Sequence, residues 1–183
     1  MNNLIQKDMK RIILYIAASL DQRIAEPDGG LEWLIGLPNP KKEDYGYKEV
    51  LASVDTVIMG GRTYREFLNM DIIWPYSEQM AYVVSHHNWG EKENLRFITE
   101  NVIETISELR NQEGKDILLV GGGELISMLL TADLIDEMQI CYVPVILGKG
   151  ISLFSEQPKE SKWKLTESNV YENGVFTVIY QRE

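Results

Sequence analysis

Three consecutive glycines stand where a predicted strand ends and a predicted helix begins. Gly121, Gly122 and Gly123 follow the apolar run 116–120, and an apolar, helix-like segment starts at Leu125. Glycines leave no side chain between backbone and ligand, and the free N–H groups and dipole of a helix N-terminus favour an anion. The turn therefore indicates a phosphate or pyrophosphate site. The alternative is a turn whose glycines only allow positive φ, and the spacing is not the G-x-G-x-x-G fingerprint.

A second glycine turn repeats this arrangement. The apolar run 56–59 ends in Gly60 and Gly61, and a helix is predicted from Thr63, its candidate N-cap. The dipole disfavours a cation in a first helical turn unless an anion is bound there. Arg62 is therefore interpreted as a phosphate partner, with a solvated surface arginine as the alternative. Two such turns favour a ligand with two anionic groups, such as a dinucleotide, at the carboxyl ends of the strands.

The elements that must position these turns alternate between strand and helix. Apolar runs predict strands at residues 11–18, 56–59, 80–85, 95–98, 116–120 and 137–145, and helices are predicted at 43–52, 63–68, 101–112 and 125–132. Strands at 164–171 and 175–180 flank Asn173-Gly174, the strongest hairpin signal in the chain. This order predicts a three-layer α/β fold with a mostly parallel sheet and an antiparallel C-terminal hairpin.

Length and composition predict one domain over residues 9–183 after a loose tail at 1–8. The single cysteine, Cys141, allows no intramolecular disulfide and no Cys-based metal site. His86 and His87 are adjacent, so on an extended segment they point opposite ways and no shared metal is expected.

The charge and hydropathy of the chain bear on its partners. A formal net charge of −10 argues against nucleic acid or an anionic membrane surface, while a small anionic ligand at a helix N-terminus remains compatible. The N-terminal residues do not resemble a signal peptide, and no apolar run approaches the ~18 residues that span a bilayer. We therefore expect a soluble, cytoplasmic protein with a small-molecule substrate.

Four motifs follow one another along the chain. They are Tyr15-Ile-Ala-Ala-Ser-Leu-Asp21 with Ile24-Ala25, Val57-Ile-Met-Gly-Gly-Arg-Thr-Tyr64, Val120-Gly-Gly-Gly-Glu124 and Pro144-Val-Ile-Leu-Gly-Lys-Gly-Ile-Ser-Leu-Phe154. In this order they resemble the dihydrofolate reductase superfamily, and more narrowly the stand-alone proteins similar to the reductase domain of riboflavin biosynthesis. The last motif is typical of that riboflavin-type branch. The resemblance implies a dihydrofolate reductase-like fold, NADPH as hydride donor and a homodimer.

The resemblance also implies where the cofactor binds. Ala18 and Ile24 would flank the nicotinamide. The residues implied at the phosphates and the adenosine ribose are Gly60, Arg62, Thr63, Ser85, His86, Gly121, Gly122, Gly123, Glu124 and Leu125. A cis bond is frequent in the family's glycine turn, so we predict one at Gly121–Gly122. Gly61 occupies the place of the arginine in the family's Met-Gly-Arg-x-Thr pattern, which leaves the preference for NADPH over NADH open.

Asp44 is the candidate catalytic residue. It lies thirteen positions before Val57, which matches the spacing of the carboxylate that holds the pterin in folate reductases. The resemblance implies that Asp44 accepts two hydrogen bonds from an amino-amide edge of the substrate and favours the protonated ring. Capping of the following helix is the alternative. The other residues implied at the substrate are Ala18, Tyr45, Lys48 and Val120.

The substrate is not expected to be an ordinary folate. No lysine or arginine occurs from Glu66 to Glu91, where folate reductases usually place the arginine for the glutamate tail, and Cys141 stands where they often place a threonine. Two functions stay open. One is an NADPH-dependent reductase acting on a pterin-like or aminopyrimidine ring, and the other is a non-catalytic NADP-binding sensing or scaffold module.

Overall fold

The computed structural model describes residues 9–154 and 158–183, so the tail predicted at residues 1–8 lies outside the described part of the chain. The helices are α1 (Glu32–Ile35), α2 (Tyr47–Ser53), α3 (Gly61–Asn69), α4 (Val102–Arg110) and α5 (Gly123–Thr131). The strands are β1 (Ile12–Ser19), β2 (Arg23–Ala25), β3 (Val54–Gly60), β4 (Met80–Val84), β5 (Leu95–Ile98), β6 (Asp116–Gly121), β7 (Glu137–Val143), β8 (Ile151–Ser152), β9 (Trp163–Val170) and β10 (Phe176–Arg182).

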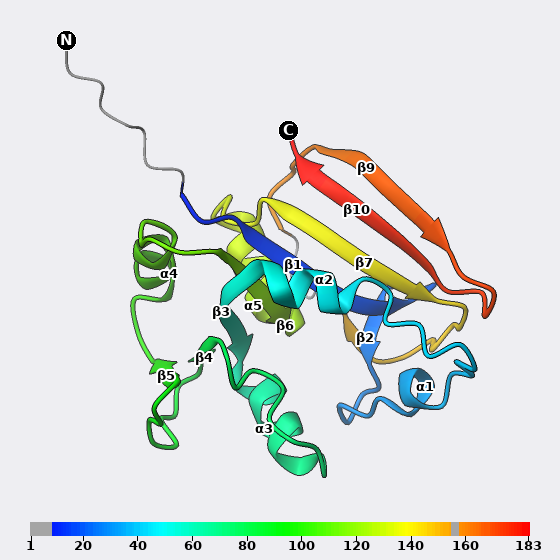
Figure 1. The fold of residues 1–183 in the computed structure, drawn as a ribbon, viewed down its shortest axis with the longest axis horizontal. Helices are drawn as coiled ribbons and strands as arrows, with labels where there is room; N and C mark the ends of the chain where they lie inside the picture. The colour runs from blue at the N-terminus through cyan, green and yellow to red at the C-terminus, as the bar shows by residue number, and fades with distance from the viewer. Residues whose placement is uncertain (1–8, 155–157) are drawn as a thin grey trace.

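Eight strands form one sheet in the order β5-β4-β3-β6-β1-β7-β10-β9. The pairs from β5 to β7 are parallel, whereas β10 pairs antiparallel with both β7 and β9. The hairpin between β9 and β10 turns at Asn173-Gly174, where Gly174 has a φ of 84°. The mostly parallel sheet with an antiparallel C-terminal hairpin is therefore confirmed (Figure 1).

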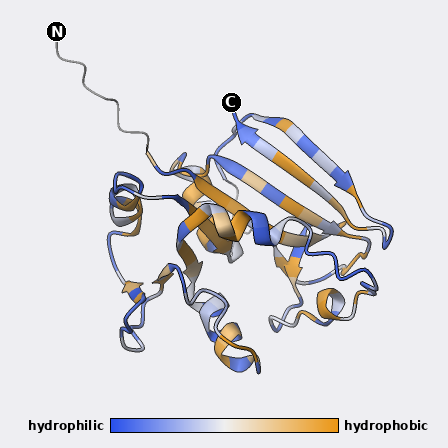
Figure 2. Cartoon of the chain, viewed as in Figure 1, coloured by the Kyte–Doolittle hydropathy of each residue, from blue (hydrophilic) through white to orange (hydrophobic). Residues whose placement is uncertain are grey.

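Helices cover both faces of the sheet. On one face, Ile12 of β1 lies in a buried cluster with Ile106 of α4 and Ile126 of α5. On the other face, Ile13 lies in a second cluster that includes Val50 of α2 and residues of α3. Successive strand residues point to opposite faces, so the predicted three layers are confirmed. Figure 2 shows that apolar residues concentrate in the central strands, while β9 and β10 carry many polar ones.

The helix predicted over residues 43–52 begins later than expected, at Tyr47. Tyr45 and Gly46 have φ angles of 55° and 86°, in the left-handed region, so the backbone cannot be helical before that point. This backbone turn orients the chain around Asp44, which therefore lies before the helix and not within it.

Several shorter features also differ from the prediction. α3 begins at Gly61 with Gly60 as its N-cap, so Thr63 lies in the first turn and the prediction of Thr63 as N-cap is wrong. The short helix α1 and the two-stranded sheet of β2 and β8 were not predicted, because segments of two to four residues show no periodicity. No helix in the described ranges is long and apolar enough to cross a bilayer.

Candidate functional site

The two glycine turns lie side by side in the structure. β3 and β6 are parallel neighbours, and Met59 is in register with Gly121, so both strands end at the same edge of the sheet. A Cβ placed on Gly60 would lie 3.6 Å from the backbone nitrogen of Gly122, and one placed on Gly122 would lie 3.7 Å from the Thr63 hydroxyl oxygen. We call Gly60, Gly61, Gly121, Gly122 and Gly123 together the glycine site.

Backbone geometry and close neighbours explain two of these glycines. Gly121 has a φ of 116°, which side-chain-bearing residues rarely adopt, and its bond to Gly122 is cis, as predicted. A Cβ on Gly61 would lie 2.8 Å from both Cβ and Oγ of Ser85 at the end of β4. The glycine site is thus a place where backbone, and not side chains, forms the surface.

Two helices start at the glycine site. The N-caps of α3 and α5 are Gly60 and Gly122, and neither N-terminus receives a side-chain capping bond. In α5 the Ile126 N–H donates to the Gly122 carbonyl at 3.0 Å, so the N–H groups from Gly123 to Leu125 precede the first helical bond. Such groups bind anions readily. The arrangement is therefore suited to a ligand with neighbouring negative charges.

The polar side chains predicted at the phosphates surround these helix starts. Arg62 is exposed in the first turn of α3 and makes no ion pair within the described ranges. Ser85 lies against Gly61 and accepts a hydrogen bond from the His87 N–H at 3.1 Å, and His86 is exposed beside it. Glu124 is exposed in the first turn of α5, whereas the side chain of Leu125 is buried, so only its N–H is available to a ligand.

The residues predicted at the nicotinamide lie on β1 and β2. The Ala18 side chain is fully buried on the face covered by α4 and α5, so a ligand can meet only its backbone. Ile24 of β2 is half-buried against the same cluster. β1 lies next to β6 in the sheet, so Ala18, near the carboxyl end of β1, lies at the same edge of the sheet as the glycine site.

Asp21 joins two of the sequence motifs. Its carboxylate accepts hydrogen bonds from the Ser19 hydroxyl at 2.7 Å and from the N–H groups of Leu147 and Gly148 at 3.0 and 2.8 Å. The Ser19 bond, reinforced by the two backbone bonds, lowers the pKa of Asp21 to about 2. The carboxylate therefore fastens the turn after β1 to the segment 144–154, next to the predicted nicotinamide position.

Asp44 acts as a backbone acceptor at the start of α2. Its two carboxylate oxygens accept the N–H groups of Gly46 and Lys48 at 3.3 and 3.2 Å. Its backbone carbonyl accepts the Tyr15 hydroxyl at 3.3 Å, and that of Tyr45 accepts the same hydroxyl at 3.1 Å. The N-cap residue of α2 is Gly46, so Asp44 supports the helix start only through these two side-chain bonds, and each oxygen keeps a lone pair for a further donor.

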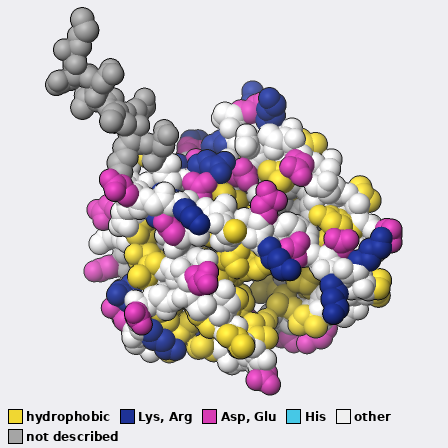
Figure 3. Space-filling view, in the orientation of Figure 1, with side chains coloured by type: hydrophobic (Ala, Val, Ile, Leu, Met, Phe, Trp, Pro, Cys, Tyr) yellow, Lys and Arg dark blue, Asp and Glu magenta, His cyan; other side chains and the backbone are white. Residues whose placement is uncertain are grey.

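A small apolar cavity of about 190 Å³ adjoins Asp44 without including it. Its lining residues come from β1, the α1 region, the start of α2 and the C-terminal strands: Tyr15, Ala17, Leu34, Leu37, Tyr45, Tyr47, Cys141, Val143 and Val175. Figure 3 shows a hollow bordered by hydrophobic side chains where Figure 1 draws β2, between α1 and α3. Of the predicted substrate residues only Tyr45 lines the cavity, since Lys48 is exposed outside it and Val120 packs in the core beneath α2.

Tyr15 and Ala17, which were not predicted as site residues, line this cavity, whereas Ala18 does not. Strand alternation places Tyr15 and Ala17 on one face and Ala18 on the other, and that pattern was the available signal. The Cys141 thiol donates to the Tyr15 hydroxyl at 3.3 Å, and burial raises the pKa of both groups. Both therefore remain protonated at neutral pH.

Comparisons with known proteins agree with this architecture. Residues 10–177 match the model of the RibD C-terminal domain. YwjB of Bacillus subtilis, a protein of uncharacterized function, is 36% identical over 157 residues, which are 85% of this chain and 89% of YwjB.

Two solved structures extend the comparison. A protein assigned to riboflavin biosynthesis in Shewanella sp. PV-4 is similar with a TM-score of 0.85 and 32% identity, over 94% of this chain and 99% of that one. The dihydrofolate reductase of Enterococcus faecalis, in complex with NADP(H) and RAB-propyl, is similar with a TM-score of 0.69 and 17% identity, over 94% and 96% of the two chains. The second similarity concerns the fold alone, and it bears out the dihydrofolate reductase-like fold.

Proposed function

Because this chain belongs to the RibD C-terminal domain family, we propose that it is an NADPH-dependent reductase that transfers a hydride to a pterin-like or aminopyrimidine ring. The reductase-type fold is common to the family and to the solved relatives. The observation that carries the proposal is the contact between the two glycine turns, where Gly60 faces Gly122.

The glycine site fits the diphosphate of a dinucleotide. Two helix N-termini without side-chain caps start there, at Gly61 and Gly123. A side chain at Gly60 would fill the space between the turns, so its absence keeps the backbone N–H groups accessible. Hydrogen bonds from such groups to a charged acceptor contribute about 1.5–3 kcal/mol each, which supports a diphosphate as the anion held here.

The surroundings of the glycine site favour a cofactor with a third phosphate. The Arg62 guanidinium has no partner within residues 9–154 and 158–183, and Ser85 and His86 lie just after the neighbouring strand β4. A 2′-phosphate on the adenosine ribose would meet these three side chains. This is the reason for proposing NADPH and not NADH.

The chain's own residues would position the reactants. Bound NADPH would supply the hydride. The Asp21 bonds hold the turn after β1 against the segment 144–154 and so shape the nicotinamide surface near Ala18. Tyr15 and Cys141 remain protonated and form one wall of the apolar cavity, which excludes water from the neighbouring ring.

Asp44 would hold the substrate ring. Each of its oxygens accepts only one long backbone hydrogen bond, at 3.3 and 3.2 Å, so each can accept one more from an amino-amide edge. A carboxylate in this position would also favour protonation of the ring that receives the hydride. An aminopyrimidine carries such an edge, as a pterin does.

A non-catalytic NADP-binding module is the second candidate. The bonds from Gly46 and Lys48 give Asp44 a sufficient role in supporting the start of α2, without any substrate. In that case the glycine site would bind NADPH and no ring would be reduced.

Two measurements distinguish these functions. Thermal unfolding is recorded with and without NADPH, and cofactor at ~100 times its dissociation constant should stabilise the protein by about 2.7 kcal/mol. The loss of NADPH absorbance is then followed with dihydrofolate and with a ribosylaminopyrimidine phosphate. Stabilisation with turnover supports the reductase, and stabilisation without turnover supports the module. No stabilisation at millimolar NADPH rejects both.

A further inference from the structure

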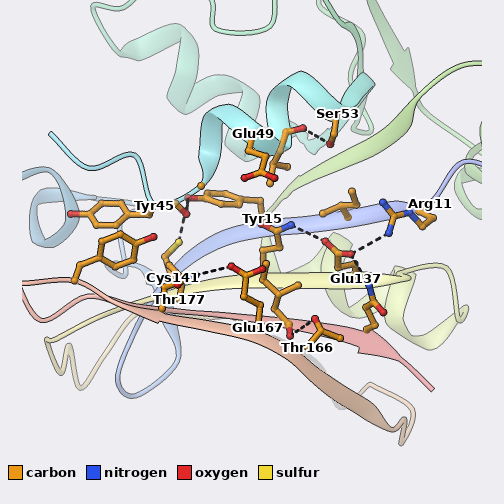
Figure 4. Close-up of a pocket in the computed structure, with 18 residues that line it drawn as sticks. Arg11, Tyr15, Tyr45, Glu49, Ser53, Glu137, Cys141, Thr166, Glu167 and Thr177 are labelled. Atoms are coloured by element: carbon orange, nitrogen blue, oxygen red, sulfur yellow. Dashed lines mark hydrogen bonds and ion pairs between the residues drawn. The ribbon is translucent and has the colours of Figure 1, made fainter.

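A second and larger cavity, of about 520 Å³, lies between α2 and the strands β7, β10 and β9 (Figure 4). Tyr15, Tyr45 and Cys141 line both this cavity and the apolar one, so the two adjoin. Its size falls within the range of small-molecule sites. We call it the polar cavity, because charged and amide side chains form much of its wall.

One side chain in the polar cavity points to a ligand. Thr177 of β10 is only 8% exposed, lines the cavity beside Cys141, and its hydroxyl has no hydrogen-bond partner within residues 9–154 and 158–183. Although the residue is mostly buried, its hydroxyl oxygen is accessible from the cavity. A ligand with a hydrogen-bond donor or acceptor could therefore bond to it.

The charge of the polar cavity is negative. Glu49 of α2 and Glu167 of β9 lie on opposite walls (Figure 4). Glu49 has no hydrogen bond or ion pair in the described part of the chain, and Glu167 accepts only the Asn169 amide, at 2.8 Å. Among the described residues, no cation forms an ion pair with either carboxylate.

Arg11, the cation that lines the cavity among the described residues, is already paired. Arg11 makes ion pairs with Asp116 at 2.7 Å and with Glu137 at 3.2 Å. Its guanidinium therefore does not offset Glu49 or Glu167. A bound anion would be repelled by these unpaired carboxylates, whereas a bound cation could form ion pairs with them.

Hydrogen-bond acceptors also prevail among the uncharged groups. The side-chain amide nitrogens of Gln139 and Gln181 both donate to Glu137, at 2.7 and 3.4 Å, and their carbonyl oxygens accept no hydrogen bond within the described residues and can serve a ligand donor. The rings of Tyr45 and Tyr171 stand edge to face, with centroids 4.9 Å apart, at the end of the cavity near Tyr15. Aromatic rings attract cations and flat apolar groups.

We propose that the polar cavity binds a small organic cation: a planar ring that carries a protonated amine or amidine, with the charged group between Glu49 and Glu167 and a donor directed at Thr177. The glycine site selects an anion, so the two sites bind ligands of opposite charge. The proposal does not rest on the reductase function, and NADPH binding can fail or succeed independently of it.

The test uses benzamidine as the cationic probe and benzamide as its uncharged isostere. Isothermal titration calorimetry at neutral pH and low salt measures both against the full chain. Glu49→Gln, Glu167→Gln, the double variant and Thr177→Val are compared with Glu108→Gln, which removes one exposed carboxylate from α4 on the other face of the sheet. Thermal unfolding confirms that each variant is folded.

The proposal expects saturable binding of benzamidine and binding of benzamide that is at least about tenfold weaker. Each glutamine variant should weaken benzamidine about three- to tenfold, Thr177→Val should weaken it by a similar factor, and Glu108→Gln should leave it unchanged. Equal affinity for the two probes, no saturable binding, or unchanged affinity in the folded double variant would overturn the proposal.

Discussion

Gly60 and Gly122 face each other across two neighbouring strands, because a Cβ on Gly60 would lie 3.6 Å from the Gly122 nitrogen. That distance is an ordinary van der Waals contact, and Gly60 has a φ of −76° that any residue can adopt. The fold therefore does not require glycine at this position for steric reasons. Glycine here instead keeps the space beside Gly122 open.

Gly60→Ala should leave folding intact and weaken NADPH at least about tenfold, because the methyl group fills the space between the helix starts. Thermal unfolding without ligand and calorimetric titration with NADPH separate the two effects. Gly61→Ala is the contrasting variant, since its Cβ would lie 2.8 Å from Ser85 and should lower stability as well. Unchanged NADPH affinity in a folded Gly60→Ala protein would remove the glycine site from cofactor binding.

Arg62→Gln should weaken NADPH about tenfold and NADH much less, because the lost guanidinium would contact the 2′-phosphate. Arg65→Gln on the same helix is the matched control, since Arg65 is also exposed and without an ion pair in the described residues. Dissociation constants for both cofactors and both variants provide the measurement. Equal losses for NADPH and NADH would place Arg62 at the diphosphate instead.

Asp44→Asn separates the two roles of Asp44. Asparagine has one acceptor oxygen where aspartate has two, so one of the long bonds from the Gly46 and Lys48 N–H groups is kept and the unfolding midpoint should fall only slightly. The charge that favours a protonated substrate ring is lost, so kcat/KM should fall at least about tenfold while the NADPH dissociation constant stays the same. Normal turnover by this variant would remove Asp44 from the mechanism.

Asp21→Asn should reduce stability in a way that depends on pH. The pKa of Asp21 is lowered from 3.8 to about 2, chiefly by the Ser19 hydroxyl. A lowered pKa means that the carboxylate favours the folded state above pH 4, and that this contribution disappears as the pH falls towards 2. The wild-type protein should therefore unfold at a higher temperature than the variant at pH 7. This difference in unfolding temperature should shrink as the pH falls from 4 towards 2.

Asp71→Asn is the control for this pH series. Asp71 is exposed and has no hydrogen bond or ion pair in the described ranges, so its substitution should shift no midpoint. A constant difference between wild type and Asp21→Asn from pH 7 down to pH 2 would contradict the role assigned to the Asp21 bonds.

The fold could be predicted because its signals are local. The β-branched runs of β1 and β3 predict buried strands, and Asn173-Gly174 predicts the hairpin that ends the sheet. The glycine site followed from the same local reasoning, since each turn joins a strand to the next helix. The α/β pattern placed both turns at the carboxyl ends of strands, but the strand order that makes them neighbours could not be predicted from local signals.

The substrate side could not be predicted to the same extent. The left-handed backbone at Tyr45 and Gly46 delays α2 and turns the Asp44 carboxylate towards backbone N–H groups, and no periodicity signals such a change. Glu49 lines the polar cavity together with Glu167 and Thr177, which lie more than a hundred residues further along the chain. Only the paired strands and the position of α2 over them create that proximity.

The hydrogen-bonded pairing of β3 with β6 has one more consequence. Adjacent strands lie about 4.8 Å apart, so the backbone ladder itself sets the separation of the two helix starts at Gly61 and Gly123. The sheet would therefore fix the distance between the two groups of N–H donors that a phosphate ligand meets. That distance would be a property of strand pairing, which no substitution on the surface changes.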